Sequence, residues 1–286
     1  MVDNLASLEQ RENNNLNMDT LLPAWNRGAH RRFGILWLAV FLAGLSLSPA
    51  AVADQALVAV AANFVEPARA LAAAFSRESG HNVQFSSGST GALYAQIIHG
   101  APFDAFLAAG EREPTRLMAE GLAAANTRFT YAIGSLVVWS ADPARIRGDC
   151  AMAVKGGAYR RVAIANPNVA PYGAAARATL QSWGLWEDIM PKLLRAESVG
   201  QAFQFAATGN AELGFVARSQ VLGLPKDRAG SYCVVDDALY PPLRQQAVLL
   251  RHGEDNAAAR GFLRFLRGAR GLDIIRESGY GVEPAP

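Results

Sequence analysis

Four short segments combine small residues with hydrogen-bond donors, and each stands where an apolar run gives way to a helical pattern. A helix N-terminus presents unpaired backbone N–H groups and the positive end of the helix dipole. Glycine lets a ligand approach the backbone, and hydroxyl side chains add further donors. The pattern therefore predicts the binding of an anion by neutral donors. The segments are Ala61-Ala62-Asn63-Phe64, Gly88-Ser89-Thr90-Gly91, Ala170-Pro171-Tyr172-Gly173 and Glu197-Ser198-Val199-Gly200.

Taken singly, each segment is also explained by helix capping, because Asn, Ser and Thr are preferred N-cap residues in any protein. The four together favour a ligand site, since open α/β sheets bind ligands at the carboxyl ends of their strands. Tyr172 supports that interpretation because it stands between Pro171 and Gly173 at a helix start, where a core aromatic residue is less expected. We expect its hydroxyl to point at the ligand.

The motifs of common enzyme classes are missing from the sequence. It contains no Gly-x-Ser-x-Gly elbow, no phosphate-binding Gly-x-x-x-x-Gly-Lys loop and no Gly-x-Gly-x-x-Gly after a strand. The histidines, at 30, 81, 99 and 252, lack the spacing of metal ligands. We expect a protein that is not an enzyme, with no metal site of its own and no cofactor. The alternative is a secreted hydrolase with Ser89 as nucleophile, which needs His81 or His99 beside it.

Composition narrows the class of protein further. The chain has 286 residues, of which 51% are hydrophobic and 18% charged, so the apolar content is too high for a disordered protein. Its 27 basic and 25 acidic residues leave a net charge of +2, which gives no electrostatic reason to expect a nucleic-acid partner.

The elements that would position the four turns alternate between strand and helix. Such alternation predicts an α/β fold with mixed, mostly parallel sheets flanked by helices. Strands are predicted at 56–60, 83–85, 104–108, 131–140, 161–165, 213–216 and 246–251. Helices are predicted at 63–79, 114–120, 199–208, 257–266 and 272–276, with two more that follow Gly91 and Gly173.

Two strand-and-helix series, with no linker rich in Pro, Gly or Ser between them, predict two lobes joined by crossing strands. The strands near 131–140 and 246–251 are the candidates for those crossings. We expect lobe I to comprise 54–136 plus 246–286, and lobe II to comprise 137–245.

The first 53 residues read as a secretory signal behind a polar extension. Arg27, Arg31 and Arg32 precede the apolar run 33–47, and Ala51-Val52-Ala53 provides a cleavage site. The run has 15 residues, fewer than the ~20 that a membrane span needs. We expect cleavage near Ala53, export to the periplasm and a start at either Met1 or Met18.

Export also bears on the two cysteines, Cys150 and Cys233. An oxidising compartment allows them to form a disulfide, and the alternative is a pair of buried thiols that act as small apolar residues.

At the four turns the sequence resembles the periplasmic molybdate-binding proteins of molybdate ABC transporters. The resemblance implies a two-lobed periplasmic binding-protein fold with molybdate, and also tungstate, held between the lobes. It further implies a monomer whose partner is the membrane permease of the transporter. The matching stretches are AANFVEPARALAAAF (61–75), GSTGALYAQIIHGAPFDAFLAAG (88–110), FTYAIGSLVVWS (129–140), VAIANPNVAPYGAAA (162–176), FQFAATGNAELGFVARSQV (203–221) and QQAVLLRHGEDNAAARGFLRFL (245–266).

Carried over residue by residue, the resemblance implies a set of ligand contacts. Asn63 stands where other members have Ser, and the hydroxyl of their second turn matches Thr90, with Ser89 beside it. Tyr172 matches a ligand of the Ala-Pro-Tyr-Gly stretch, and Val199 matches a backbone N–H donor. Some members also use a Tyr where this chain has Ala217, so Tyr172 is expected to supply the phenol. The substitutions at 63 and 90 keep open a receptor for another tetrahedral oxyanion, such as sulfate or phosphate.

Overall fold

The computed structural model describes residues 54–283, which belong to one compact unit, Ala53–Pro286. The predicted secretory signal falls on residues 1–53 and lies outside the described residues. Within 54–283, no helix has both the length and the apolar character that crossing a membrane would require.

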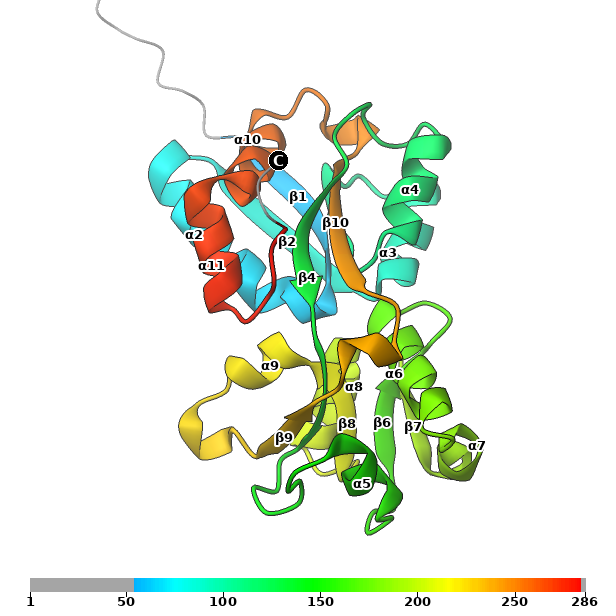
Figure 1. The fold of residues 1–286 in the computed structure, drawn as a ribbon. Coiled ribbons are helices and arrows are strands. Elements are labelled where there is room, and N and C mark those ends of the chain that lie inside the picture. Colours follow the sequence, from blue (N-terminus) through cyan, green and yellow to red (C-terminus); the bar gives the residue numbers. More distant parts are fainter. Residues whose placement is uncertain (1–53, 284–286) are drawn as a thin grey trace, which may run out of the picture. The chain divides into compact units, whose positions relative to one another are not determined.

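Lobe I is built on a sheet with the strand order β2-β1-β3-β10-β4 (Figure 1). β1 runs parallel to β2 and β3, whereas β10 is antiparallel to β3 and β4. The strands are β1 (Gln55–Ala61), β2 (Asn82–Gly88), β3 (Ala105–Leu107), β4 (Phe129–Gly134) and β10 (Leu243–Leu249). The helices are α2 (Val65–Ser79), α3 (Thr90–Ile98), α4 (Arg112–Ala119), α10 (Ala257–Arg267) and α11 (Ala269–Glu277).

Side chains of the interior strand β1 alternate between two apolar clusters of lobe I. Val58 and Val60 pack in the cluster that contains residues of α2 and α10. Ala59 packs in the cluster formed with α3 and α4. The two-residue period of a strand thus buries both faces of the sheet under helices.

Lobe II repeats this design with the strand order β7-β6-β8-β5-β9. β6 runs parallel to β7 and β8, and β5 is antiparallel to β8 and β9. The strands are β5 (Leu136–Ser140), β6 (Val162–Ala165), β7 (Leu193–Ala196), β8 (Leu213–Ala217) and β9 (Ser231–Val234). The helices are α5 (Cys150–Lys155), α6 (Pro171–Ser182), α7 (Trp186–Ile189), α8 (Val199–Ala207) and α9 (Arg218–Leu222).

Short 3-10 segments complete the connections. They are η2 (Ala62–Phe64), η3 (Met190–Lys192), η4 (Lys226–Arg228), η5 (Asp237–Leu239) and η6 (Arg251–Gly253).

The two five-stranded mixed sheets, each flanked by helices, confirm the predicted two-lobed α/β fold.

The chain crosses between the lobes at two places. It passes from β4 to β5 at Ser135, so the strand predicted over 131–140 is two strands, one in each sheet. It returns between β9 and β10, and not within 246–251 as expected, because β10 already pairs with β4 from Leu243 onward. The expected lobe limits were 136/137 and 245/246. The sheets place Leu136 in lobe II and the range 243–245 in lobe I.

Cys150 and Cys233 form a disulfide with a Cα–Cα distance of 5.6 Å. It joins the first residue of α5 to the edge strand β9. Of the two alternatives that the sequence left open, the structure contains the bridge.

Candidate functional site

The four predicted turns lie around one small cavity between the lobes. The cavity has a volume of about 10 Å³. Lobe I contributes the residues after β1 and β2, and lobe II contributes the starts of α6 and α8. The lining residues are Ala61, Ala62, Asn63, Gly88, Ser89, Thr90, Ala109, Ala170, Pro171, Tyr172 and Val199. The structure thus brings together Asn63, Ser89, Thr90, Tyr172 and Val199, the residues predicted from the sequence.

The parallel strands explain why the turns meet. β1 and β2 run side by side in lobe I, so their carboxyl ends, Ala61 and Gly88, lie opposite each other at one sheet edge. β6 and β7 do the same in lobe II. Each strand is followed by a helix whose first turn lies at that edge, as is usual for ligand sites in open α/β sheets.

The capping interpretation is confirmed at two of the four turns, where it is compatible with ligand binding, and no side chain caps the helix starts at the other two. Ser89 Oγ accepts the N–H of Ala92 at 3.4 Å as the N-cap of α3, and Ser198 caps α8. Thr90 Oγ1 accepts the N–H of Ala109 at 3.0 Å. A hydroxyl that accepts through its oxygen still carries a proton to donate. Val199, the first residue of α8, has a backbone N–H without an intrahelical acceptor.

Tyr172 lies on α6 with its side chain 1% exposed. Its hydroxyl accepts a hydrogen bond from Gln245 Nε2 at 3.4 Å. Burial, with the neighbouring hydroxyls of Tyr280 and Tyr131, raises the pKa of Tyr172 well above its ordinary value. The phenol therefore stays protonated in neutral solution and keeps a proton to donate.

Asn63 differs from expectation in what its side chain contacts. Its Nδ2 donates to Gln245 Oε1 at 2.9 Å and to Tyr280 Oη at 2.9 Å. Its Oδ1 is buried and has no hydrogen-bond partner among residues 54–283. The amide N–H₂ predicted to face an anion is thus used elsewhere, and the backbone N–H at the start of η2 is the donor that Asn63 keeps.

Pro67 explains the position of Tyr280. A helical carbonyl normally accepts from the residue four positions on, but a proline there has no N–H. The carbonyl oxygen of Asn63 instead accepts the hydroxyl of Tyr280 at 2.8 Å. Ser219 Oγ, on α9 of lobe II, donates to the same phenol at 2.7 Å, so this contact joins the lobes.

Sequence reasoning missed the residues behind the cavity: Gln245, Tyr131 and Tyr280. Gln245 is fully buried, and its Oε1 accepts from Tyr131 Oη at 3.1 Å as well as from Asn63. The only local signal was a pair of glutamines in the otherwise apolar stretch QQAVLL (245–250).

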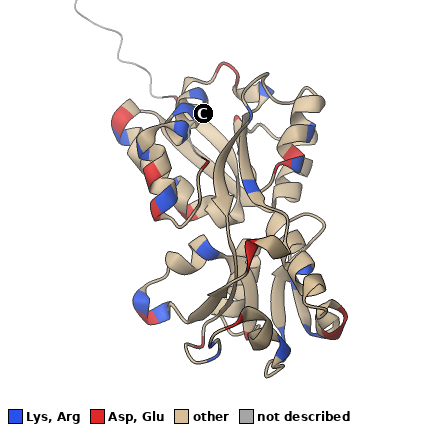
Figure 2. Cartoon of the chain, viewed as in Figure 1, with Lys and Arg blue, Asp and Glu red and all other residues tan. Residues whose placement is uncertain are grey.

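The cavity carries no formal charge. Among residues 54–283, its lining includes no Lys, Arg, His, Asp or Glu. The same part of the chain holds no group of three or more His, Cys, Asp and Glu placed to bind a metal ion. Figure 2 shows charges of both signs interspersed over the two lobes.

The lobes touch around the cavity. Gly91 N–H on α3 donates to Val169 O of lobe II at 2.8 Å. A Cβ added at Gly200 on α8 would lie 3.1 Å from the Cβ of Ala62. The structure is therefore a closed arrangement in which both lobes enclose the site.

Among residues 54–283, the structure does not bring a histidine to Ser89. His81 Nδ1 accepts the N–H of Asp54 at 3.2 Å. His99 is the C-cap residue of α3, at the opposite end of the helix from Ser89. The arrangement that a serine hydrolase needs is not formed in this part of the chain.

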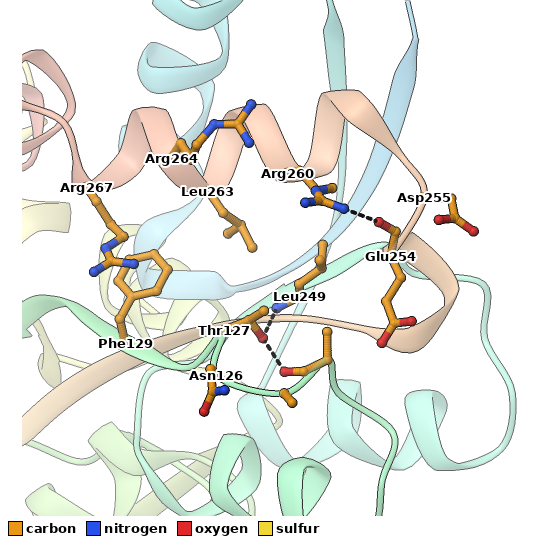
Figure 3. A pocket seen from close by; sticks show the side chains of 12 residues that line it. Asn126, Thr127, Phe129, Leu249, Glu254, Asp255, Arg260, Leu263, Arg264 and Arg267 are labelled. Carbon is orange, nitrogen blue, oxygen red and sulfur yellow. Dashed lines mark hydrogen bonds between the residues drawn. The ribbon is translucent and has the colours of Figure 1, made fainter.

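A wider pocket of about 460 Å³ lies elsewhere on lobe I (Figure 3). Arg260, Arg264 and Arg267 of α10 line it together with Glu254 and Asp255. It contains none of the residues predicted to bind a ligand. As an alternative place for an anion to bind, it supplies a control for the experiments below.

Comparison with known proteins adds an independent observation. The family described as bacterial extracellular solute-binding protein matches residues 56–281. The chain is 48% identical over 252 residues to the molybdate-binding protein ModA of Rhodobacter capsulatus, covering 88% of this chain and 97% of that protein. It is 46% identical over 251 residues to ModA of Azotobacter vinelandii, covering 88% and 99%.

A solved structure is also similar. The periplasmic molybdate-binding protein of Azotobacter vinelandii matches with a TM-score of 0.77 and 38% identity, over 80% of this chain and 100% of that chain. The family match includes all four turns that line the cavity.

Proposed function

The chain belongs to the bacterial extracellular solute-binding proteins, and we propose that it captures molybdate between its lobes and delivers it to an ABC importer. The observation that carries the proposal is the enclosed, uncharged cavity into which four helix starts bring donors. The chain's identity of 46–48% to molybdate-binding proteins supports the choice of molybdate among the oxyanions.

A tetrahedral dianion gives up its hydration when it enters a closed cavity, and only several hydrogen bonds can offset that loss. Helix N-termini and hydroxyls supply such bonds without a formal positive charge. We assign the hydroxyls of Ser89, Thr90 and Tyr172 and the backbone N–H groups of Asn63 and Val199 as the donors. Because donors predominate, a protonated oxyanion would find few acceptors for its O–H.

The remaining parts of the proposal follow from this role. Tungstate has the same shape and charge as molybdate and should bind as well. The closed form is the one that the membrane permease would recognise, and the protein would act as a monomer in the periplasm. Its role is binding and not catalysis, without a cofactor, in keeping with relatives that are named as binding proteins.

Calorimetric titration of the chain from Asp54 onward tests the proposal. We expect saturable binding of molybdate at low micromolar concentration or below, and no binding of excess sulfate or phosphate. An Arg264→Ala variant, altered in the pocket of Figure 3, should bind molybdate unchanged. Tighter binding of sulfate or phosphate would make the protein a receptor for that ion. No binding of any of these ions would overturn the proposal.

A further inference from the structure

We propose that Gln245 is a positioning residue that directs the hydroxyl proton of Tyr172 into the cavity and thereby sets the affinity for the oxyanion. The inference rests on the proposed function. It concerns a residue that does not line the cavity and that would act through Tyr172.

Gln245 connects donor-bearing residues of both lobes. On β10 of lobe I, it is completely buried where the chain returns from lobe II. Its Oε1 accepts from Asn63 Nδ2 at 2.9 Å and from Tyr131 Oη at 3.1 Å. Its Nε2 donates to Tyr172 Oη at 3.4 Å. One carboxamide therefore links η2 and β4 of lobe I to α6 of lobe II.

The two ends of the carboxamide fix the direction of these hydrogen bonds. An amide nitrogen only donates, and a phenol has a single proton. Because Nε2 donates to the oxygen of Tyr172, the phenol proton is not needed by Gln245. Tyr172 lines the cavity, so that proton is available to an oxygen of the ligand.

The opposite orientation would present a different donor. With both amides turned over, Gln245 would donate to Asn63 Oδ1 and accept from Tyr172, and the Asn63 N–H₂ would be released. Tyr172 Oη and Asn63 Nδ2 are thus alternative donors, of which the network supplies one. The orientation observed also satisfies Tyr280 Oη, which accepts from Asn63 Nδ2 while donating to Asn63 O at 2.8 Å.

A double-mutant cycle tests whether the effect of Gln245 on molybdate affinity requires the hydroxyl of Tyr172. Tyr172→Phe removes the donor and should weaken molybdate binding about 10- to 100-fold. Gln245→Met keeps the length of the side chain but frees the phenol to turn, and we expect a loss of about tenfold. In the Gln245→Met background, Tyr172→Phe should cost less than about threefold. Losses that simply multiply would overturn the proposal.

Gln245→Glu supplies a readout that a merely structural role would not move. A carboxylate only accepts hydrogen bonds, so it would accept one from the Tyr172 hydroxyl and would add a negative charge. We expect at least about a 100-fold loss relative to wild type near neutral pH. Protonation of the buried carboxyl restores a donor, so the loss should shrink to about tenfold as the pH falls through the pKa of the introduced carboxyl group. A loss independent of pH would contradict the role of Gln245.

The titratable and charged side chains near position 245 do not interfere with this titration. Tyr131, Tyr172 and Tyr280 have raised pKa values and stay neutral below pH 10. Tyr240, which lies close enough to Tyr172 to affect it, also has a raised pKa. The adjacent Arg244 pairs with Glu111 and Glu283.

Gln246→Met is the matched control. Gln246 is also buried on β10, but its side chain bonds to Arg128, Glu111 and Thr130, outside the cavity. We expect its molybdate affinity to equal that of wild type. If Gln246→Met weakened binding as much as Gln245→Met, the effect would be general damage to β10. Wild-type binding of molybdate is measured first, so failure of the proposed function is seen separately.

Discussion

Gly91 brings the backbones of the two lobes into contact. Its N–H donates to Val169 O at 2.8 Å. An added Cβ would lie 3.0 Å from the Cα, Cβ and carbonyl oxygen of Val169. Gly91 is the second residue of α3, so a side chain there is acceptable to the helix. The glycine is needed for closure and not for the fold of lobe I.

Gly91→Ala should therefore weaken molybdate binding without lowering the stability of the ligand-free protein. Crowding at a rigid contact costs about 1–3 kcal/mol, or about 5- to 150-fold in affinity. Alanine is favoured over glycine in helices by up to ~1 kcal/mol. Calorimetric titration and thermal unfolding without ligand measure the two effects. Gln96→Ala, at an exposed position of α3, is the control, and unchanged affinity in Gly91→Ala would show that closure tolerates a side chain there.

At the scale of the element, helices and strands with a clear pattern in a short stretch of sequence could be predicted, and elements without such a pattern could not. The amphipathic pattern after Asn63 and the stop at Gly80 correspond to α2, whose C-cap Gly80 has a φ of 75°. The short strands β7 and β9 were missed, because LLRA and SYCV do not form an apolar run, unlike the equally short VAIA of β6.

The candidate site shows the same division between local and long-range information. The turns around Ser89 and Val199 are local, and both were found from the sequence. The bonds from Asn63 to Gln245 and Tyr280 span 182 and 217 residues. Such contacts depend on how the strands assemble, and no local pattern records them.

The disulfide between α5 and β9 makes a prediction at this scale. Replacing both Cys150 and Cys233 by alanine should lower the free energy of unfolding by about 2–4 kcal/mol, because the bridge restricts the unfolded chain. Molybdate affinity should be unchanged, since neither residue lines the cavity. Urea unfolding of the two proteins measures the difference.

Reductant provides the control for the disulfide experiment. It should lower the urea midpoint of unfolding of the wild-type protein toward that of the double variant and leave the variant's midpoint unchanged. Equal midpoints for the oxidised wild type and the variant would mean that the bridge does not stabilise the fold.

At the scale of the whole described unit, three buried tyrosines meet where the lobes join. Tyr131 comes from β4, Tyr172 from α6 and Tyr280 from the segment after α11. Burial raises the pKa of Tyr131 and Tyr172 well above 10.0, and it raises the pKa of Tyr280 to about 12. The three phenols at the joint between the lobes are therefore neutral in the folded protein near neutral pH.

These pKa values predict how stability depends on alkaline pH. A group with a raised pKa stabilises the folded state fully below its unfolded pKa, and that contribution is lost as the pH rises toward the folded value. For Tyr280 the loss runs from pH 10 to about 12. Over this range each such tyrosine should lower the free energy of unfolding by about 1.4 kcal/mol per pH unit, because its hydroxyl ionises in the unfolded chain and not in the folded chain.

Urea unfolding followed across that range, beside the phenolate absorbance of the folded protein, measures this loss. Tyr280→Phe should reduce the dependence of the unfolding free energy on pH by about the share of one tyrosine, ~1.4 kcal/mol per pH unit. Its lower stability near neutral pH, from the lost bonds to Asn63 and Ser219, is a separate effect. The same pH dependence in wild type and variant would mean that Tyr280 ionises as readily folded as unfolded. The neutral joint between the lobes would then need another explanation.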